Sequence, residues 1–322
     1  MIEREIIIVG GGPSGAAAAW KLKQAGRDVL ILDKAQFPRV KLCAGWITPR
    51  VWHYLGVKPK EYPHSLITLK KLHYHIHERH IPLPTRQYSI RRYEFDHWLL
   101  QRSEADIHQH RVQEIRQEAD GRFVIDDTYR CTYLIGAGGT NCPVYRTFFE
   151  GSNVRNPFKR ITAMELEYQT EYHDPRCLLW FFDHDLSGYS WYVPKGGGYV
   201  NIGIGGRFGD LRVKNQTIRQ HWEWFAQRIE ILGLLSNVPR KVPGYNYYLH
   251  DDTHTVQKGN VFLIGDAAGV GTLDMGEGIA PAIQSGLLAA RSILNGTPYT
   301  IKMVHRYSLF DLLFWWRFGL AK

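Results

Sequence analysis

A glycine-rich turn near the N-terminus constrains the fold of this chain more than any other feature. Residues 5–9 form a run of apolar side chains that is typical of a strand buried on both faces. The run leads into Gly10-Gly-Gly-Pro-Ser-Gly15 and then into good helix formers over residues 16–25. A second strand is predicted over residues 28–32 and ends at Asp33, 18 residues after Gly15. This order and spacing predict a βαβ unit that binds a dinucleotide.

The main positions of this unit have separate physical tasks. Gly10 permits the tight turn, Gly12 lets the backbone approach a pyrophosphate, and Gly15 allows the helix to pack closely. The helix start supplies amide donors and positive potential. Asp33 is placed to accept hydrogen bonds from a ribose 2′-hydroxyl, which fits an unphosphorylated ADP ribose. A glycine-rich turn without any ligand is the plainer alternative, and the surrounding strand and helix disfavour it.

A second segment indicates that the dinucleotide is FAD and not NAD. Residues 261–269 read Val-Phe-Leu-Ile-Gly-Asp-Ala-Ala-Gly, so a predicted strand ends in Gly265-Asp266, where a carboxylate can meet ribityl hydroxyls. Gly276-Glu-Gly-Ile279 then opens a predicted helix whose amides can face the flavin pyrimidine oxygen. Two anion-binding helix starts in one chain suit one long cofactor, and the sequence therefore predicts FAD.

The remaining pattern predicts an α/β fold of two domains, as the length of 322 residues suggests. Alternating aromatic segments over residues 161–206 predict an antiparallel sheet, and apolar spacing predicts a helix over 218–232 that follows an Asn215 cap. Strand and helix signals return over 259–264 and 278–294, so the nucleotide domain is predicted to be discontinuous. We assign residues 1–60, 90–155 and 255–300 to a Rossmann-like FAD-binding domain, residues 61–89 and 156–254 to a substrate or cap domain, and residues 301–322 to a C-terminal aromatic helix.

Charge and composition restrict the classes of partner that the chain is expected to bind. The chain has 40 Lys and Arg against 31 Asp and Glu, a formal charge of +9 that favours anionic partners, and no nucleic-acid-binding motif is present. Its aromatic content of 13% suits an apolar cavity or lipid contact. The 4 cysteines form no CxxC pair, which argues against a disulfide framework or zinc site and fits a reducing, cytoplasmic compartment. The first strand leaves no room for a secretory signal, and no apolar run reaches the roughly 18 residues of a membrane span.

Longer motifs resemble the geranylgeranyl reductase family of flavoproteins, within the wider group that holds aromatic hydroxylases and flavin halogenases. The strongest is GDAAG over residues 265–269, followed by GEGIxPAxxSGxxAA from residue 276. The other matching stretches are LDKxxFPRxKxC over residues 32–43, RxxFDxWL over 92–99, GYSWYVPK over 188–195 and NIGIG over 201–205. The similarity covers most of the chain, to about residue 295.

This resemblance implies that Arg92 contacts the cofactor near its phosphates and that Cys43-Ala44-Gly45 passes close to the isoalloxazine. Two departures matter. The family usually has glycine where Ala44 stands, which affects the shape of the flavin pocket, and Gly138 lacks the acidic or small polar neighbour that supplies a ribityl contact. The predicted cofactor-binding residues are Gly10, Gly12, Pro13, Ser14, Gly15, Asp33, Lys34, Lys41, Cys43, Ala44, Gly45, Arg92, Val112, Gly138, Gly265, Asp266, Gly276, Gly278 and Ile279.

Three residues are candidates for catalysis, and each has a plainer interpretation. Cys43 is a candidate proton donor or redox partner of the flavin, or else an inert packing residue. The resemblance implies that the sheet bearing Tyr189 and Trp191 covers the substrate cavity. These two side chains either position substrate or donate a proton, or they belong to an ordinary aromatic core. An ordered water is a further candidate donor.

Two other segments leave alternatives open. His73-Tyr-His-Ile-His77, with His80 beyond it, places histidines on one strand face in a geometry that can bind metal, but without nearby Cys or carboxylates we predict a solvated hairpin face and no metal. Residues 309–320, with aromatic side chains beside Arg317 and Lys322, fit an amphipathic helix peripheral to a membrane, a cap on the core, or a dimer contact.

The resemblance favours hydride transfer from reduced FAD to a carbon–carbon double bond of an isoprenoid or other apolar substrate. A flavin monooxygenase or halogenase is the alternative, but Gly269 stands where aromatic hydroxylases carry His, and residues 188–194 only approximate the halogenase pattern. A non-catalytic FAD-binding component of a membrane-associated assembly is the alternative from another class.

The source of electrons is predicted to lie outside this chain. Gly136-Ala-Gly-Gly139 leads into Thr140-Asn-Cys-Pro143 instead of a helix, so no second dinucleotide domain is predicted. Reducing equivalents must then come from a docking NAD(P)H, a ferredoxin-like protein or a quinol, and the basic surface favours an acidic protein donor.

Overall fold

The computed structural model describes residues 1–171 and 174–314, except for the side chains of residues 312 and 313. Its contacts divide the chain into two compact units, each assembled from three segments. Unit 1 comprises Met1–Arg39, Tyr93–Arg155 and Tyr247–Ser308; unit 2 comprises Val40–Arg92, Asn156–Asn246 and a C-terminal segment that begins at Leu309.

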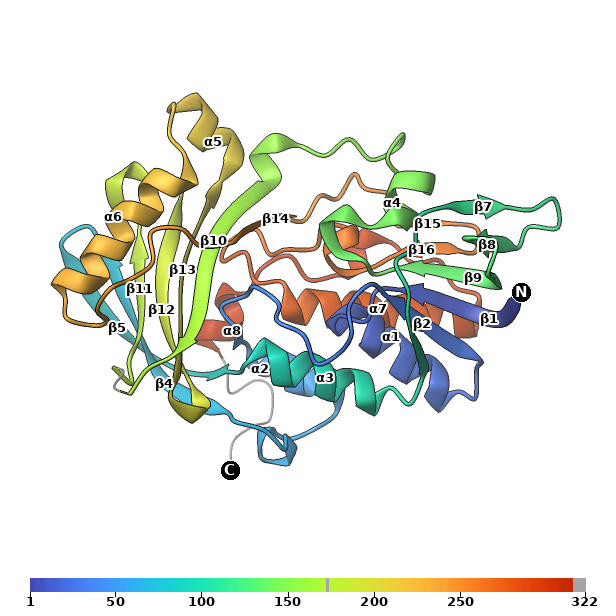
Figure 1. The fold of residues 1–322 in the computed structure, drawn as a ribbon, viewed down its shortest axis with the longest axis horizontal. Helices are drawn as coiled ribbons and strands as arrows, with labels where there is room; N and C mark the ends of the chain where they lie inside the picture. The colour runs from blue at the N-terminus through green and yellow to red at the C-terminus, as the bar shows by residue number, and fades with distance from the viewer. Residues whose placement is uncertain (172–173, 315–322) are drawn as a thin grey trace. The chain divides into compact units, whose positions relative to one another are not determined.

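A largely parallel sheet forms the centre of unit 1 (Figure 1). Its strands lie in the order β15-β16-β9-β1-β2-β6, and a β7–β8 hairpin joins it where β8 pairs with β9. The strands are β1 Ile2–Val9, β2 Val29–Asp33, β6 Asp106–Gln109, β7 Ile115–Gln117, β8 Phe123–Ile125, β9 Tyr129–Gly136, β15 Gln257–Lys258 and β16 Val261–Leu263. Ile6, Ile7 and Ile8 of β1 are fully buried, as the apolar run predicted.

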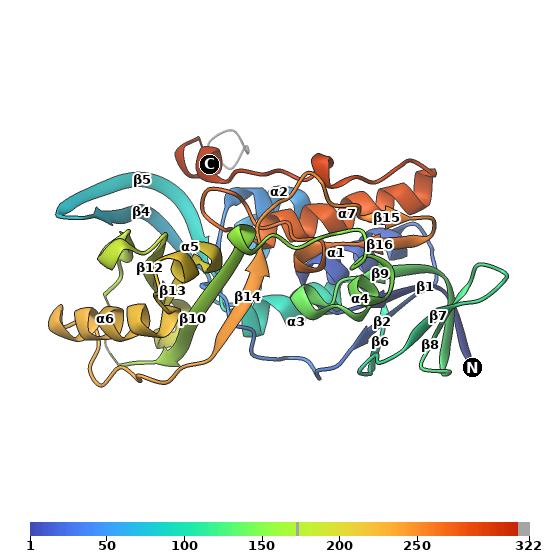
Figure 2. The same cartoon turned by 90° about the horizontal axis from the view of Figure 1, so that it is seen from above.

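The helices of unit 1 are α1 Pro13–Gln24, α3 Arg92–Arg102 from its second residue onward, α4 Pro143–Phe148 and α7 Ile279–Asn295. Helices α1 and α7 lie side by side (Figures 1 and 2). Glycine allows this approach, because a Cβ at Gly286 would lie 2.3 Å from the carbonyl oxygen of Ser14. The start of α1 therefore packs against the middle of α7.

Unit 2 is built around a second sheet of eight strands in the order β14-β10-β13-β12-β11-β4-β5-β3. The strands are β3 Trp46–Ile47, β4 Ile67–Ile76, β5 Arg79–Ser89, β10 Arg160–Gln169, β11 Cys177–Phe181, β12 Gly188–Lys195, β13 Tyr199–Arg207 and β14 Gly244–Tyr248. The β10-β13-β12-β11 pairings are antiparallel, as predicted, whereas β11 pairs with β4 in parallel.

One face of this sheet is covered by helix α6, Ile218–Ile231 (Figure 2). Trp222, Phe225 and Ile229 of α6 pack into one apolar core with Ile202 and Ile204 of β13. Because side chains alternate along a strand, the neighbouring positions of β10, β12 and β13 face the other side of the sheet. The other helices of unit 2 are α2 Pro49–Leu55, α5 Phe208–Val213 and α8 Leu309–Leu313.

Single 3₁₀ turns connect many of these elements. They span Pro59–Glu61, Gly139–Asn141, Pro157–Lys159, Asp183–Asp185, Gly196–Gly198, Gly265–Ala267 and Ile301–Met303. The turn at Gly139–Asn141 leads directly into α4, so the prediction that no helix follows Gly139 was wrong. Helix α4 has only 6 residues, because Pro143 fixes its start and the chain leaves the helix at Phe149.

Four boundaries of these units differ from those predicted for the domains, and the smallest difference places residues 90–92 in unit 2. Residues 40–60 fall in unit 2 because β3 pairs with β5 and α2 packs on β5. Residues 247–254 and 301–308 fall in unit 1. These segments lack the strong periodicity that revealed the longer elements, so the sequence could not place them.

The cap of α6 was also predicted wrongly. Thr217, not Asn215, begins the helix: its Oγ1 accepts the N–H of Gln220 at 3.3 Å, and Gln220 Oε1 accepts the N–H of Thr217 at 2.8 Å. This reciprocal pair is a capping box. Asn215 instead occupies the left-handed region with φ of +54°.

The C-terminal segment begins with α8. Asp311 is buried and pairs with Arg50 of α2 at 2.5 Å, whereas Phe310 is exposed. The predicted aromatic helix over residues 309–320 runs beyond the described residues, which end at residue 314. Among the described residues no helix is long and apolar enough to cross a membrane.

Candidate functional site

The turn between β1 and α1 leaves the first amides of α1 without a side-chain cap. Gly10 has φ of +115°, and a Cβ there would lie 2.4 Å from the carbonyl oxygen of Ala137. A Cβ at Gly15 would lie 2.0 Å from the carbonyl oxygen of Gly10. At Gly12 the nearest atom to a Cβ is 3.7 Å away, at the end of the Arg39 side chain. The turn is therefore closed at Gly10 and Gly15 and open at Gly12, where a phosphate can meet helix amides.

Asp33, the last residue of β2, braces this turn from the neighbouring strand. Its Oδ2 accepts the N–H of Gly11 at 2.8 Å, and its Oδ1 accepts the N–H of Ala35 at 2.9 Å. The side chain is buried at 8% exposure. Each carboxylate oxygen can accept more than one hydrogen bond, so Asp33 can hold the turn and still bind a ribose hydroxyl.

The Gly265–Ala267 turn reaches the start of α1. A Cβ at Gly265, whose φ is +59°, would lie 2.5 Å from Ser14 Oγ. The N–H of Gly265 donates to Ser285 Oγ of α7 at 2.9 Å. A Cβ at Gly278 would lie 3.8 Å from Asp266 Oδ1. Three segments that are distant in sequence thus meet within unit 1: the start of α1, this turn and the start of α7.

The start of α7 is shaped by glycine and one carboxylate. Gly276 has φ of +64°, and a Cβ there would lie 2.5 Å from the Tyr247 hydroxyl. Gly278 is the N-cap of α7 and offers no side-chain cap. Glu277 takes over one helix donor, since its Oε1 accepts the N–H of Ala280 at 2.7 Å. The helix start thus keeps backbone donors that a ligand can use.

Residues 306 and 308, which precede the C-terminal segment, form hydrogen bonds with the loop that leads to α7. The Arg306 carbonyl accepts the N–H of Leu273 at 2.8 Å, and the N–H of Ser308 donates to Asp274 Oδ2 at 2.8 Å. Sequence reasoning assigned residues 301–308 to the C-terminal helix and missed this brace. No local motif signals it, because it depends on pairing between segments far apart in the chain.

Unit 1 therefore fits a long dinucleotide. A pyrophosphate, a ribose and a ribityl chain require helix amides and carboxylates. Unit 1 offers the uncapped start of α1, the amides at the start of α7 that Glu277 does not occupy, and the carboxylates of Asp33 and Asp266. Lys34 and Gly138 are exposed and Val112 is buried. The predicted cofactor-binding residues in unit 1 are Gly10, Gly12, Pro13, Ser14, Gly15, Asp33, Lys34, Val112, Gly138, Gly265, Asp266, Gly276, Gly278 and Ile279; those in unit 2 are Lys41, Cys43, Ala44, Gly45 and Arg92.

Within unit 2 the Cys43-Ala44-Gly45 loop is held against β12. Gly45 has φ of +57°, and a Cβ there would lie 2.2 Å from the Ile90 carbonyl oxygen. The Lys195 ammonium, at the end of β12, donates to the carbonyl oxygens of Ala44 and Ile90. Burial lowers the pKa of Lys195 to about 8. A buried cation thus fixes the loop that contains Cys43.

Glu165 of β10 is a second buried ionisable group in unit 2. The residue is 1% exposed, and its Oε2 has no hydrogen-bond partner among the described residues. Burial raises the pKa of Glu165 to about 7, although the charges of Lys195 and Lys41 act in the opposite direction. The carboxyl group is therefore partly protonated at neutral pH.

Asn201 of β13 links this carboxyl group to an aromatic side chain. Its Oδ1 accepts the indole N–H of Trp191 at 2.7 Å, and its amide group interacts with Glu165. The backbone of Cys43 interacts with the same carboxyl group. Gly203 of β13 pairs with Glu165 of β10 on one side and with Trp191 of β12 on the other. A Cβ at Gly203 would lie 2.2 Å from the Trp191 ring and 2.7 Å from Glu165 Cβ. Glycine at this position lets the indole lie across β13 toward Glu165.

Glu165, Lys195 and Asn201 form what we call the Glu165 cluster. A row of aromatic rings leads to this cluster on the face of the sheet opposite α6. Tyr74 stacks on Phe181 with ring centroids 5.5 Å apart, and Phe181 stacks on Tyr189 at 4.9 Å. Tyr189 meets Trp191 at 5.8 Å in a tilted arrangement. Phe181 and Tyr189 are partly exposed, whereas Tyr74 and Trp191 are buried. We call these four residues the aromatic row.

Two of the three predicted catalytic residues, Tyr189 and Trp191, thus lie together in the aromatic row, and Cys43 interacts with the Glu165 cluster through its backbone. Sequence reasoning missed the charged and amide side chains of that cluster. A signal was present, since Lys195 continues the alternation of Trp191 and Val193 on one strand face. Which strands pair with β12 could not be read from the sequence, so the partners of Lys195 could not be named.

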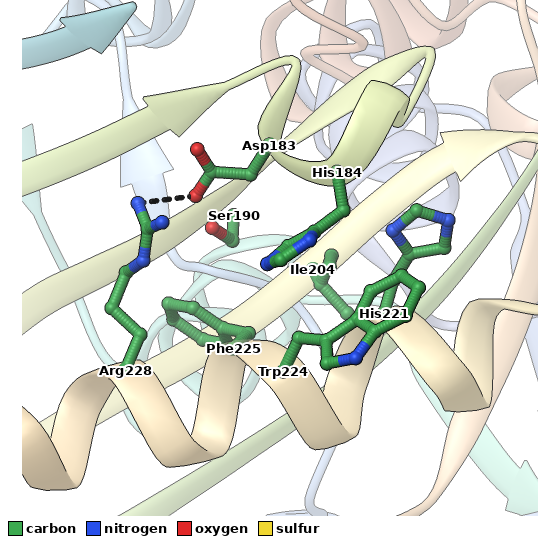
Figure 3. A pocket seen from close by; sticks show the side chains of 8 residues that line it. All are labelled: Asp183, His184, Ser190, Ile204, His221, Trp224, Phe225 and Arg228. Carbon is green, nitrogen blue, oxygen red and sulfur yellow. Dashed lines mark ion pairs between the residues drawn. The ribbon is translucent and has the colours of Figure 1, made fainter. Parts of the chain in front are cut away.

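The small pocket drawn in Figure 3 lies on the other face of the sheet, under α6. Its volume is about 10 Å³, which is the size of one water. Asp183 pairs with Arg228 of α6 at 2.6 Å, and His184 stacks on Trp224 at 4.4 Å (Figure 3). These contacts fasten α6 to the turn after β11, and the pocket is too small for a substrate.

The histidines of the β4–β5 hairpin stack on one another. His73 Nδ1 and His80 Nε2 lie 3.0 Å apart, and the ring of His80 stacks on that of His75 at 4.6 Å. Burial lowers the pKa of His75 to about 4. His77 lies in the turn with φ of +52°, so it does not share the strand face. No cluster of metal-ligating side chains occurs among the described residues.

Comparison with known proteins identifies similar chains. A family model described as an NAD(P)-binding Rossmann-like domain matches residues 8–42. An uncharacterised protein of Methanosarcina barkeri is 30% identical over 91% of this chain and 75% of its own length. Menaquinone reductase of Mycolicibacterium smegmatis is 28% identical over 91% of this chain and 76% of its own. Digeranylgeranylglycerophospholipid reductase 2 of Methanopyrus kandleri is 26% identical over 83% and 71%.

Solved structures support the fold. A geranylgeranyl bacteriochlorophyll reductase-like protein from Thermoplasma acidophilum matches with a TM-score of 0.79 at 18% identity, over 100% of this chain and 89% of that one. A myxobacterial chondrochloren halogenase, described as FAD-dependent, matches with a TM-score of 0.73 at 18% identity, over 94% and 78%. The Rossmann-like FAD-binding fold with a second sheet domain, which the sequence predicted, is confirmed.

Proposed function

Because this chain belongs to the geranylgeranyl reductase family of FAD-dependent oxidoreductases, we propose that it reduces carbon–carbon double bonds in the isoprenoid chain of an apolar substrate. The cofactor supplies the hydride for such a reduction. The names of the relatives support this choice, since they include a digeranylgeranylglycerophospholipid reductase and a menaquinone reductase. The chondrochloren halogenase and the geranylgeranyl bacteriochlorophyll reductase-like structure are both 18% identical to this chain, so each supports the fold alone, and the choice of reaction rests on the named relatives.

The observation that carries the proposal is the aromatic row. Its four rings form a continuous apolar surface across β4, β11 and β12, on the sheet face that α6 does not cover. Apolar surface of this kind binds a hydrocarbon chain without the cost of burying polar groups. The partial exposure of Phe181 and Tyr189 leaves room for a ligand to pack on them.

Unit 1 supplies the groups for the cofactor. We propose that the amides at Gly12 to Gly15 bind the pyrophosphate and that Asp33 binds the ribose of the adenosine half. Asp266 would bind ribityl hydroxyls, and the backbone donors at the start of α7 would bind the flavin ring. These groups bind and orient; the redox chemistry is that of the cofactor.

Three side chains of unit 2 are proposed to act on the substrate. Tyr189 and Trp191 position it, because they form one end of the aromatic row. The indole N–H of Trp191 already donates to Asn201, so this side chain is better suited to packing than to proton donation. Cys43 remains a candidate proton donor, with a thiol that is half-buried and accepts the N–H of Gly45 at 3.4 Å.

An external carrier is proposed to deliver the electrons. The described part of the chain contains one sheet that has the dinucleotide-binding turn and helix, and that sheet is assigned to FAD. The formal charge of +9 favours an acidic protein donor, with NAD(P)H and a quinol as the other candidates. Contact of the basic surface with anionic lipid would bring the protein to its apolar substrate.

An anaerobic single-turnover experiment tests the proposal. FAD-loaded protein is reduced with dithionite and mixed with geranylgeraniol, a geranylgeranyl phospholipid or menaquinone in detergent micelles. We expect the flavin absorbance to return with one probe, and mass spectrometry to find a product that has gained two hydrogens in its isoprenoid chain. Menaquinone is reoxidised to the quinone before it is analysed, so that reduction of its ring is not counted. Return of flavin absorbance only with oxygen, together with a hydroxylated or halogenated product, would overturn the proposal in favour of a monooxygenase or halogenase.

A further inference from the structure

The Glu165 cluster contains a buried acid that lies outside the residues assigned to the cofactor. A carboxyl group at 1% exposure with one unpartnered oxygen is costly to bury when ionised. An apolar side chain of similar size would pack at this position on β10 without that cost. The position therefore retains a carboxyl group for its chemistry.

The surroundings of Glu165 favour a group that both holds and releases a proton. The charged or polar groups that face it are Lys195 from β12, Lys41 and the Cys43 backbone from the loop, and Asn201 from β13. Burial raises the pKa of Glu165 to about 7, and the two lysines keep it from rising further. A proton donor is most effective when its pKa lies near the working pH.

The location of Glu165 connects it with the substrate surface. Trp191 is the last ring of the aromatic row, and its indole reaches across Gly203 toward Glu165. Asn201 hydrogen-bonds to the same indole and interacts with the carboxyl group. An apolar chain that packs along the aromatic row therefore ends its path beside a buried acid.

We propose that Glu165 is the internal acid of this protein and supplies the proton that completes reduction of the double bond. The inference rests on the proposed function. In the reaction the π bond breaks, one carbon would receive the hydride that reduced FAD supplies as it is oxidised, and the neighbouring carbon receives the proton of Glu165. The O–H bond of Glu165 breaks, its electron pair stays on the carboxylate, and solvent returns the proton after the product leaves. Lys195 stabilises the carboxylate that forms.

The test compares the wild type with Glu165→Gln, which keeps the size but has no acidic proton, and with Glu165→Asp, which keeps the acid on a shorter side chain. Each protein is loaded with FAD, and flavin content and melting temperature establish that it is folded. In the anaerobic single turnover, Glu165→Gln is expected to slow alkene reduction about 100-fold. Glu165→Asp is expected to retain a measurable part of the rate, with an altered pH profile.

A second measurement needs no substrate. Infrared difference spectra between acid and alkaline pH should contain the band of a protonated carboxyl group that titrates near neutral pH in the wild type and is missing in Glu165→Gln. Absence of that band overturns the inference, as does a Glu165→Gln rate and pH profile equal to those of the wild type. If the wild type itself reduces none of the alkene probes, the proposed function fails, and the role of Glu165 in it falls too, even where the infrared band is present.

Discussion

The two units build their functional surfaces from different materials. Unit 1 uses backbone: glycines at Gly10, Gly15 and Gly265 bring chain segments within contact, and helix amides are left uncapped. Unit 2 uses side chains: Glu165 and Lys195 are charged groups placed in a buried sheet beside an aromatic row. Because the same cofactor is always bound, its site can be built from fixed backbone groups. Protonation and the packing of an apolar chain require side chains.

The backbone part of this comparison is tested most strongly by Gly15→Ala. The added Cβ would lie 2.0 Å from the Gly10 carbonyl oxygen, so the turn must move and its amides lose their alignment. We expect protein that purifies without FAD and is destabilised by about 1–3 kcal/mol. Gly151→Ala is the matched control, because nothing lies within 4 Å of its Cβ position. Flavin absorbance per mole of protein measures the effect, and full FAD content in Gly15→Ala would contradict it.

The side-chain part is tested by Lys195→Met, which removes the buried cation but keeps most of its volume. The Ala44 and Ile90 carbonyl oxygens then lose their donor, and Glu165 loses a stabilising charge. We expect the free energy of unfolding to fall by about 2–6 kcal/mol, because each of the two buried carbonyl oxygens left without a donor costs about 1–3 kcal/mol. Lys70→Met, on the exposed side of β4, should change it by less than about 0.5 kcal/mol. Equal urea midpoints for the two variants would remove the proposed role of Lys195.

Glu165 makes stability depend on pH with a definite sign. Its folded pKa of about 7 lies above the ordinary value of 4.5, so the folded state holds this proton more tightly than the unfolded state does. The resulting stabilisation is fully present below pH 4.5 and is lost as pH rises through about 7. Over that window we expect the wild type to lose about 3 kcal/mol more than Glu165→Gln. Urea unfolding of both proteins at several pH values measures this difference, and parallel curves would show that Glu165 does not titrate in this range.

The same contrast explains what could be predicted from the sequence. The spacing of Gly10, Gly12 and Gly15 is local, so the motif by itself identifies the turn and its helix, and residues 265–269 add the identity of the cofactor. Asp33 ends the next strand of the same βαβ unit, so the spacing of that unit also predicts its position. The Rossmann-like fold and the sheet over residues 161–206 follow from periodicity, which is local as well.

The Glu165 cluster could not be predicted because three strands contribute to it. Glu165, Lys195 and Asn201 meet only after β10, β13 and β12 have paired in one register. A shift of one residue would turn each of them to the α6 side of the sheet. The brace from Arg306 to Leu273 was missed for a related reason, since it joins two loops without periodicity.

The aromatic row is expected to contribute less than the charged cluster. Phe181→Leu removes the ring that stacks on both Tyr74 and Tyr189 but keeps an apolar side chain. Aromatic pairs contribute about 1 kcal/mol beyond their buried area, so we expect KM for the isoprenoid substrate to rise about fivefold with little change in kcat. Phe158→Leu is the control, because that ring is 52% exposed and lies in the Pro157–Lys159 turn, outside the row. An equal rise in both variants would show that the row does not hold the substrate.

The smallest effect concerns the helix starts themselves. Helix α6 is capped by the Thr217 side chain, whereas α1 begins at Gly12 without a side-chain cap. This difference distinguishes a helix with a structural role from a helix whose first amides bind a ligand. Thr217→Ala should therefore lower the free energy of unfolding by about 1 kcal/mol and leave FAD content unchanged. Asn215→Gly, at the position that the sequence predicted as the cap, should not destabilise, since φ of +54° suits glycine. Urea unfolding of both variants decides between the two caps. If Asn215→Gly lowered the free energy of unfolding and Thr217→Ala did not, the sequence-based assignment of the cap would be restored.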